Sequence, residues 1–312
     1  MQSTPIQPTK SLLHWLILCL LIGIAALLIV ISTDTASSGG PDDGLLHLAG
    51  ATSLLRDGDY PIVQRPPLYS LLLTALAFTQ SIDPANTTPS AQELGSITTF
   101  DVAQGLLQPG YLRLILWIQL IMWAATLLLL AFALRSLTIG WRGVYVAVIL
   151  SFVPSSWRMT GLVSEAILCQ FLLMLGMVGL IKALTGARSW SIIAGVSFAL
   201  LAFAKPTFQL LSPVLLILIV LMFIWQHRQR DWRPLLPLSL GLLLPWVIIV
   251  GGWSLHNQAT HGFLGMSGVG GVALSTRTAL YLERAAATYP EEVAIFQGIR
   301  NQLFIDTPAK ND

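Results

Sequence analysis

The sequence predicts an all-α polytopic membrane protein. Of its 312 residues, 54% are hydrophobic and only 10% are charged, whereas a soluble domain of ordinary composition has about 25% charged residues. A chain this apolar cannot bury all its apolar side chains inside one water-exposed globule, so lipid is expected to surround it. The second observation is a series of apolar runs close to the ~20 residues that cross a bilayer as a helix.

Seven of these apolar runs are expected to be transmembrane helices. They cover roughly residues 12–32, 112–134, 141–156, 164–183, 190–204, 207–226 and 235–253. The first run is longer than the roughly 7–15-residue core of a signal peptide. This favours an uncleaved first helix, although the small residues at 35–38 keep a cleaved signal open. The predicted organisation is a transmembrane domain over 1–253 and an external segment over 254–312.

The distribution of charge predicts which side of the membrane each connection faces. Basic residues gather in one set of short connections and in the N-terminal tail: Lys10, Arg135, Arg142, Lys182, Arg188, Arg228, Arg230 and Arg233. Because Lys and Arg are enriched in cytoplasmic loops, this set is expected to be cytoplasmic. The long segment 33–111, the later turns and the C-terminal tail are then external, and they contain every acidic residue except Asp231. We expect a plasma-membrane or bacterial-style inner-membrane protein.

Two short helices are expected within the external segment 33–111. Leu45, Leu48, Thr52 and Leu55 form an apolar stripe at helical spacing, and Asp43, His47 and Gly50 share another face. This pattern predicts an amphipathic interfacial helix over 43–57 that ends at Gly58. The apolar run 66–78 is too short to cross the bilayer and predicts a re-entrant or interfacial helix. Residues 79–110 are polar and predict an external loop.

Asp42 and Asp43 stand directly before the first of these short helices. Asp at a helix start is typical of an N-cap, where its carboxylate accepts backbone hydrogen bonds. The same position keeps the carboxylate ionised, as a base that takes a proton from a hydroxyl must be. Taken alone, the pair favours the cap.

A set of motifs changes that balance. Asp43, His47, Gly58-Asp59-Tyr60 and the stretch from Arg65 to Tyr69 together resemble the first external loop of GT-C glycosyltransferases. The most similar type is that of the protein mannosyltransferases and lipid A aminoarabinose transferases. The resemblance continues through Ser164-Glu165, Lys205-Pro206 and residues 257–274, and so covers most of the chain. It departs at Gly44, where members often have an acidic residue, and at His47, where they often have Tyr.

The resemblance implies a GT-C-like helical bundle and a function. Such enzymes transfer a sugar from a polyprenyl-phosphate-linked donor to a lipid, glycan or protein acceptor at the external face. Asp43 matches the residue that activates the acceptor, with Asp42 in support, and Arg65 matches the cation that contacts the donor phosphate. His47, Tyr69 and Glu165 are then candidate acceptor-site or supporting residues.

The same residues also have structural interpretations. Arg65 and Lys205 could be interfacial anchors with their charged ends in water, or two contacts for one phosphate. Glu165 could cap a helix or pair with Arg158. The histidines are too scattered to predict a metal site, so no cofactor is assigned and a divalent metal remains open.

Other classes of function fit less well. The net charge of +2 and the lack of a basic run argue against a nucleic-acid partner. A non-catalytic transporter or assembly protein on a similar scaffold is the main alternative. Transporters place ionisable residues near the middle of the membrane and often show paired halves, whereas here the charges cluster on one outer rim and the sequence shows no paired halves, which favours the enzyme. A lipid-linked polysaccharide ligase or polymerase, which would also need external basic residues, stays open.

Overall fold

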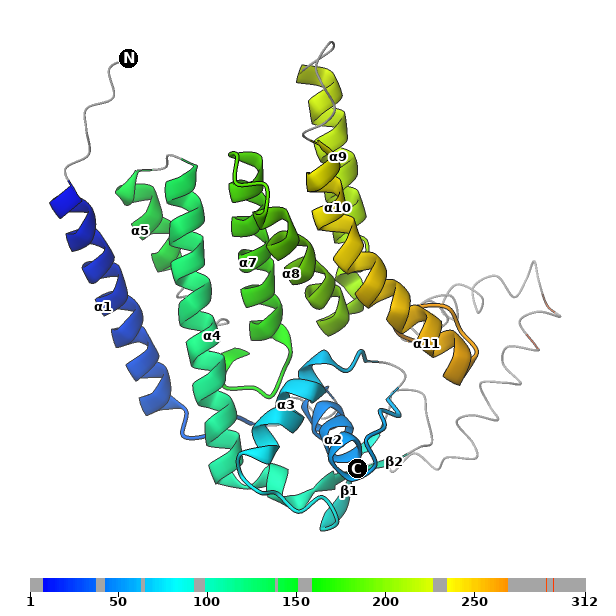
Figure 1. Ribbon diagram of the computed structural model, residues 1–312. Coiled ribbons are helices and arrows are strands. Elements are labelled where there is room, and N and C mark those ends of the chain that lie inside the picture. Colours follow the sequence, from blue (N-terminus) through cyan, green and yellow to red (C-terminus); the bar gives the residue numbers. More distant parts are fainter. Residues whose placement is uncertain are drawn as a thin grey trace.

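The protein is mostly helical. The computed structural model describes residues 8–37, 43–62, 65–92, 99–137, 140–150, 159–226 and 235–268, together with 290 and 294. The helices of the bundle run up and down side by side (Figure 1). They are α1 (Pro8–Ser32), α4 (Pro109–Ser136), α5 (Trp141–Leu150), α7 (Ala166–Leu184), α8 (Trp190–Ala204), α9 (Leu211–Gln226), α10 (Leu235–Trp246) and α11 (Gly252–His261).

Within the described residues, five helical segments are long and apolar enough to cross a membrane. These are Leu12–Ser32, Pro109–Ser136, Ala166–Leu184, Pro206–Trp225 and Leu235–His261. They correspond to five of the seven predicted spans. The other two predicted spans correspond to α8, which has 15 residues, and to α5, which has 10. The expected continuation of α5 over 151–156 lies outside the described residues.

The centre of the bundle is formed by α4, α7, α8 and α10, which pack in that order. Glycine allows the tightest of these contacts. A Cβ atom on Gly195 of α8 would collide with the carbonyl oxygen of Gly241 on α10, and one on Gly179 of α7 would lie 2.9 Å from the backbone nitrogen of Ala194. Small residues at helix crossings are typical of membrane proteins, where close backbone packing replaces a hydrophobic driving force.

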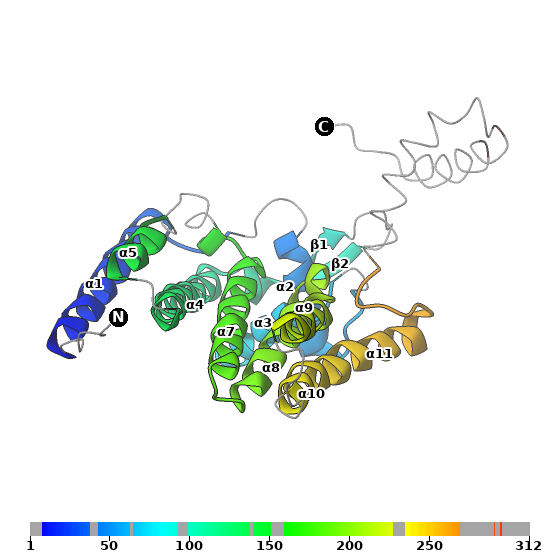
Figure 2. The same ribbon diagram turned by 90° about the horizontal axis from the view of Figure 1, so that it is seen from above.

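The outer helices leave long apolar side chains uncovered. In α1, Leu12, Leu20 and Ile31 are exposed, and α9 exposes residues such as Ile217 and Trp225. Figure 2 shows α1 at one edge of the bundle, next to α5 and α4. Apolar surfaces of this extent are rare on soluble monomers, so they fit helices surrounded by lipid.

The last predicted span is longer than expected. It was predicted to end at residue 253, but α10 continues through a π-helical segment, Val247–Gly251, directly into α11 and ends at His261. Pro245 lies inside α10. Because proline has no backbone N–H and its ring clashes with the preceding turn, the wider turn that follows it accommodates the lost hydrogen bond. Gly262, with φ of 77°, ends the helix.

The two short helices predicted in segment 33–111 are present as α2 (Asp43–Arg56) and α3 (Leu68–Phe78). Gly58 follows α2 with φ of 69°, which fits its predicted role as the helix end. The predicted amphipathic pattern is wrong, however. Both faces of α2 are buried, including Leu46, His47 and Ala51, because α3 packs on one side and a β-hairpin on another.

That hairpin corrects a second prediction. Residues 79–110 were expected to be a loop, but β1 (Thr87–Gln92) and β2 (Thr99–Ala103) form an antiparallel pair, followed by a short 3-10 helix over Gln104–Leu107. The Ala103 N–H donates a 2.9 Å hydrogen bond to Thr52 Oγ1 of α2. The register shifts between Pro89 and Ala91, because proline cannot donate to a ladder, and this irregularity hides the strand pattern.

The short elements all gather at one end of the bundle (Figure 1). There α2, α3 and the hairpin lie beside the beginnings of α4 and α7 and the end of α8. Backbone hydrogen bonds join the segment after α1 to the turn before α7, from Ser37 N to Gly161 O (2.8 Å) and from Val163 N to Ser37 O (2.7 Å). The predicted grouping of segment 33–111 with the turns before α7 and after α8 is therefore present in the fold.

Candidate functional site

Four of the predicted site residues meet at this end of the bundle. His47 comes from α2, Arg65 from the segment before α3, Glu165 from the turn before α7, and Lys205 from the residue that follows α8. They are separated by up to 158 positions in the sequence. Each of the other three places a polar atom near the Glu165 carboxylate, which is the centre of the cluster.

Glu165 is a buried carboxylate, with 2% of its surface exposed. Its Oε2 lies 3.0 Å from His47 Nε2. Its Oε1 accepts a hydrogen bond from Lys205 Nζ at 3.1 Å and lies 3.8 Å from Arg65 Nη1. A charge at this depth is tolerated only when it is paired and hydrogen-bonded, and both oxygens of this carboxylate are occupied.

These contacts determine the protonation state of Glu165. Burial by itself raises the pKa of a carboxyl group, but here the hydrogen bond from His47 and the positive charges nearby outweigh burial and lower the pKa of Glu165 below its ordinary range. The carboxylate therefore stays ionised. A carboxylate held by cations is a weak base, so Glu165 is better suited to position its neighbours than to accept a proton.

His47 is a buried member of the cluster, with 1% of its surface exposed. An ionised carboxylate can only accept hydrogen bonds, so Nε2, which faces Glu165, carries a proton and donates this hydrogen bond. The other ring nitrogen, Nδ1, is buried and has no hydrogen-bond partner among the described residues. The edge of the ring contacts Tyr69 with 4.9 Å between ring centroids. One carboxylate and one aromatic ring thus fix the orientation of the imidazole.

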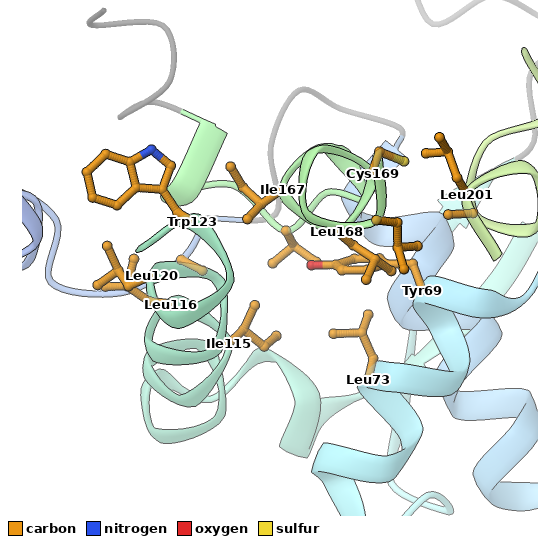
Figure 3. Close-up of a cluster of buried hydrophobic side chains, with 14 of the residues drawn as sticks. Tyr69, Leu73, Ile115, Leu116, Leu120, Trp123, Ile167, Leu168, Cys169 and Leu201 are labelled. Carbon is orange, nitrogen blue, oxygen red and sulfur yellow. The ribbon is translucent and has the colours of Figure 1, made fainter. Parts of the chain in front are cut away.

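Tyr69 lies between the cluster and the hydrophobic core, where it contacts the ring of His47. Its side chain points into the buried core among Leu73, Ile115 and Leu168 (Figure 3). Burial raises the pKa of the Tyr69 hydroxyl well above its ordinary value of 10.0. The hydroxyl therefore remains neutral, and Tyr69 has a supporting role rather than that of an acid or base.

Gln119 is a functional candidate that the sequence analysis missed. From the middle of α4, its Nε2 donates to Tyr69 Oη (2.7 Å) and to the carbonyl oxygen of Leu162 (2.9 Å). It therefore ties α3 to the turn that presents Glu165. The signal in the sequence is a glutamine inside an apolar run, since polar residues in membrane spans are rare and usually functional.

The two cations connect the buried carboxylate with the surface. The Lys205 side chain is 40% exposed and that of Arg65 is 22% exposed, whereas that of Glu165 is 3% exposed. One carboxylate and two cations leave one positive charge when His47 is neutral. Guanidinium and ammonium groups that converge in this way are typical of sites for phosphate or carboxylate.

One of the two structural interpretations of Glu165 can now be corrected. The residue stands immediately before α7 but its side chain makes no capping hydrogen bond among the described residues, while Ser164 Oγ accepts from the Ala166 N–H at 3.3 Å. Arg158, the predicted ion-pair partner, lies outside the described residues. Among the described residues, the carboxylate contacts Lys205 and His47, because the turns before α7 and after α8 lie against α2.

The predicted acidic pair is placed only in part. Asp42 lies outside the described residues. Asp43 begins α2, four residues before His47, and its side chain is outside the described part of the structure. Residues four apart on a helix share a face, so Asp43 stands on the same face of α2 as His47, one turn earlier.

No metal centre is visible in the described ranges, where no three His, Cys, Asp or Glu side chains lie close enough together to hold an ion. His256 and His261 lie on α11, and His47 faces Glu165 with two cations behind it. The cluster itself therefore suits an anion better than a metal.

Comparisons with protein-family models, with curated proteins and with solved structures find nothing that matches this chain.

Proposed function

We propose that the protein is an integral membrane glycosyltransferase of GT-C type, which transfers a sugar from a polyprenyl-phosphate-linked donor to a lipid, glycan or protein acceptor. The observation that carries the proposal is the convergence of Arg65 and Lys205 on Glu165. The sequence pattern that resembles these enzymes includes all three residues, and they come from three separate parts of the chain.

The two cations are the proposed phosphate site. Arg65 is the residue that the resemblance assigns to the donor phosphate, and Lys205 lies within reach of the same carboxylate oxygen. Both side chains reach the surface, where a lipid phosphate can approach. The charge of the phosphate would be balanced by the single positive charge that Glu165 leaves uncompensated. His47 and Tyr69 support the site from its buried side.

Asp43 is the proposed base, with Asp42 in support. The acceptor hydroxyl oxygen forms a bond to the anomeric carbon of the sugar, and the bond from that carbon to the phosphate oxygen breaks. The electron pair stays on the phosphate, and the hydroxyl proton passes to Asp43. Arg65 and Lys205 then stabilise the additional negative charge on the departing phosphate. Inversion at the anomeric carbon is expected from the resemblance.

The proposal includes the membrane topology. The proposed topology has a cytoplasmic N-terminus and seven spans, with α8 as a short span and α5 as the described part of another. The cluster, the short helices and the hairpin would then face the exterior or periplasm of a plasma or inner membrane. The basic ends of α4 and α7, which contain Arg135 and Lys182, support this orientation under the positive-inside rule.

The decisive experiment measures lipid binding and sugar release in the same samples. Purified wild type, Arg65→Ala and Arg113→Ala are each incubated with a polyprenyl-phosphate sugar. Arg113 is the matched control, because it pairs with Asp34 at the same end of the bundle (2.9 Å) but outside the cluster. We expect Arg65→Ala to lose binding by about 10–100-fold, as for a charged hydrogen bond worth about 1.5–3 kcal/mol, and Arg113→Ala to resemble wild type.

Each outcome has a distinct meaning. Wild-type binding by Arg65→Ala contradicts the phosphate site. Binding without sugar release favours the alternative function, a non-catalytic transporter or assembly protein that holds the same lipid. No binding by the wild type contradicts the donor class.

A further inference from the structure

The net charge of the cluster balances the charge of the donor lipid in the proposed reaction but not that of the product lipid. This inference rests on the proposed function. The donor is a phosphodiester, which has one negative charge. The product is a phosphate monoester, which has between about 1.5 and 2 negative charges at neutral pH, because its second pKa is near 6. The reaction therefore adds negative charge within the site.

The charged groups around the Glu165 carboxylate do not balance the charge of the product. Arg65 and Lys205 contribute two positive charges and Glu165 one negative charge, so with a neutral His47 these four groups have a net charge of +1. This balances a phosphodiester. A fully ionised monoester leaves one negative charge uncompensated by these groups, and a group among them that gains a proton would supply the missing positive charge.

We propose that His47 takes up a proton when a phosphate monoester occupies the site, so that the net charge of the site rises from +1 to +2. Histidine is the side chain whose charge ordinarily changes between about pH 5 and 8. Its Nε2 faces Glu165 at 3.0 Å, and its buried Nδ1 has no hydrogen-bond partner among the described residues. Protonation at Nδ1 keeps the Nε2 hydrogen bond to Glu165, so the charged ring would be paired with a carboxylate.

The surroundings of His47 explain why the proton would follow the ligand. Glu165 favours a charged ring, whereas Arg65 and Lys205, on the far side of the carboxylate, oppose it. A monoester bound by the two cations supplies negative charge that cancels this opposition. Tyr69 contacts the ring edge and stays neutral, and Asp43 stands one turn earlier on α2. Binding of a ligand with a second negative charge is thus coupled to the uptake of one proton by His47.

The proposal predicts different pH dependences for two closely related lipids. A polyprenyl phosphate should bind with uptake of roughly one proton, so above about pH 7 its affinity should fall by up to about tenfold per pH unit as pH rises. The methyl ester of the same polyprenyl phosphate is a phosphodiester, and its affinity should not change over this range. Titration calorimetry in buffers of different ionisation enthalpy counts the protons directly.

Two histidine variants test whether His47 is the group that takes up the proton. In His47→Gln the proton uptake and the pH dependence for the monoester should both disappear, while the methyl ester still binds. His261→Gln is the matched control, because His261 is exposed on α11 outside the cluster, and it should keep the wild-type pH dependence. Imidazole ¹⁵N spectra of the wild type provide the same information without a substitution, as one of the five histidines should become charged with the monoester alone.

The possible failures are distinguishable. If neither lipid binds the wild type, or if inorganic phosphate binds as well as the lipid, the proposed function fails. If both lipids bind without proton uptake, or if His47→Gln retains the uptake, the proposed function stands and the role of His47 is overturned.

Discussion

Lys205 donates a 3.1 Å hydrogen bond to Glu165, a carboxylate with only 2% of its surface exposed. The bond joins the residue after α8 to the turn before α7, and both turns lie at the end of the bundle that holds α2 and α3. Its consequence is that a partly exposed cation is held in place by a buried anion. Arg65 is held by the same oxygen at 3.8 Å, so one carboxylate positions both proposed phosphate ligands.

Replacing Glu165 with Gln should destabilise the protein. The change removes the charge that holds the cations, and the amide cannot accept hydrogen bonds on both sides. We expect a loss of about 1–3 kcal/mol in the free energy of unfolding, as for a disrupted buried hydrogen-bond network. Thermal denaturation in detergent measures it. Asp34→Asn, which alters an exposed pair with Arg113, should leave the melting temperature within the scatter of the wild type.

The stability contributed by Glu165 should depend on pH in a defined direction. Because the folded protein lowers the pKa of Glu165 below its ordinary value of 4.5, its stabilising contribution is fully present above that pH. It is lost progressively as the pH falls below it, since the unfolded chain then binds the proton more readily. The melting temperatures of wild type and Glu165→Gln should therefore approach each other in acid. A difference that stays constant down to about pH 3 contradicts the ion pair.

Asp43→Asn should greatly slow sugar transfer and leave lipid binding intact. The amide has nearly the shape of the carboxylate but cannot accept the acceptor proton, so we expect transfer to fall by about 10²–10⁴-fold. Binding of the polyprenyl-phosphate sugar is the control within the same variant. Transfer at the wild-type rate by a folded Asp43→Asn protein assigns the base elsewhere.

Gln119→Leu tests how the cluster is positioned. The change keeps the volume but removes hydrogen bonds to Tyr69 and to the carbonyl of Leu162, which should cost about 1–3 kcal/mol. The turn before α7 should then hold Glu165 less firmly and weaken binding of the polyprenyl phosphate. Tyr69→Phe is the matched comparison, because it removes only the first of these bonds and should have a smaller effect on both quantities.

Gly195→Ala tests the contact between α8 and α10. The added methyl group would collide with the carbonyl oxygen of Gly241, so the helices must separate, at a cost of about 1–3 kcal/mol. Because Lys205 follows the end of α8, lipid binding should weaken together with stability. Gly23→Ala on α1 is the control, since a Cβ there has nothing within 4 Å, and it should be neutral in both assays.

The elements that the sequence predicted well are those whose signal is local. Apolar length identified all five segments long enough to cross a membrane, and Gly58 correctly marked the end of α2. The hairpin over 87–103 was missed because Pro89 interrupts its pattern. The burial of α2 was missed because it depends on α3 and the hairpin, which cover a helix whose own pattern predicts an exposed face.

The sequence by itself determined which residues are available to form a site. A few charged residues in an apolar chain, among them Arg65, Glu165 and Lys205, are conspicuous because charge beside a membrane span is costly. Only the tertiary structure decided their partners. His47 and Glu165 are 118 positions apart, and no local pattern encodes a contact over that distance. Helix packing creates it, in part through Gln119, which joins α4 to α3 and to the turn before α7.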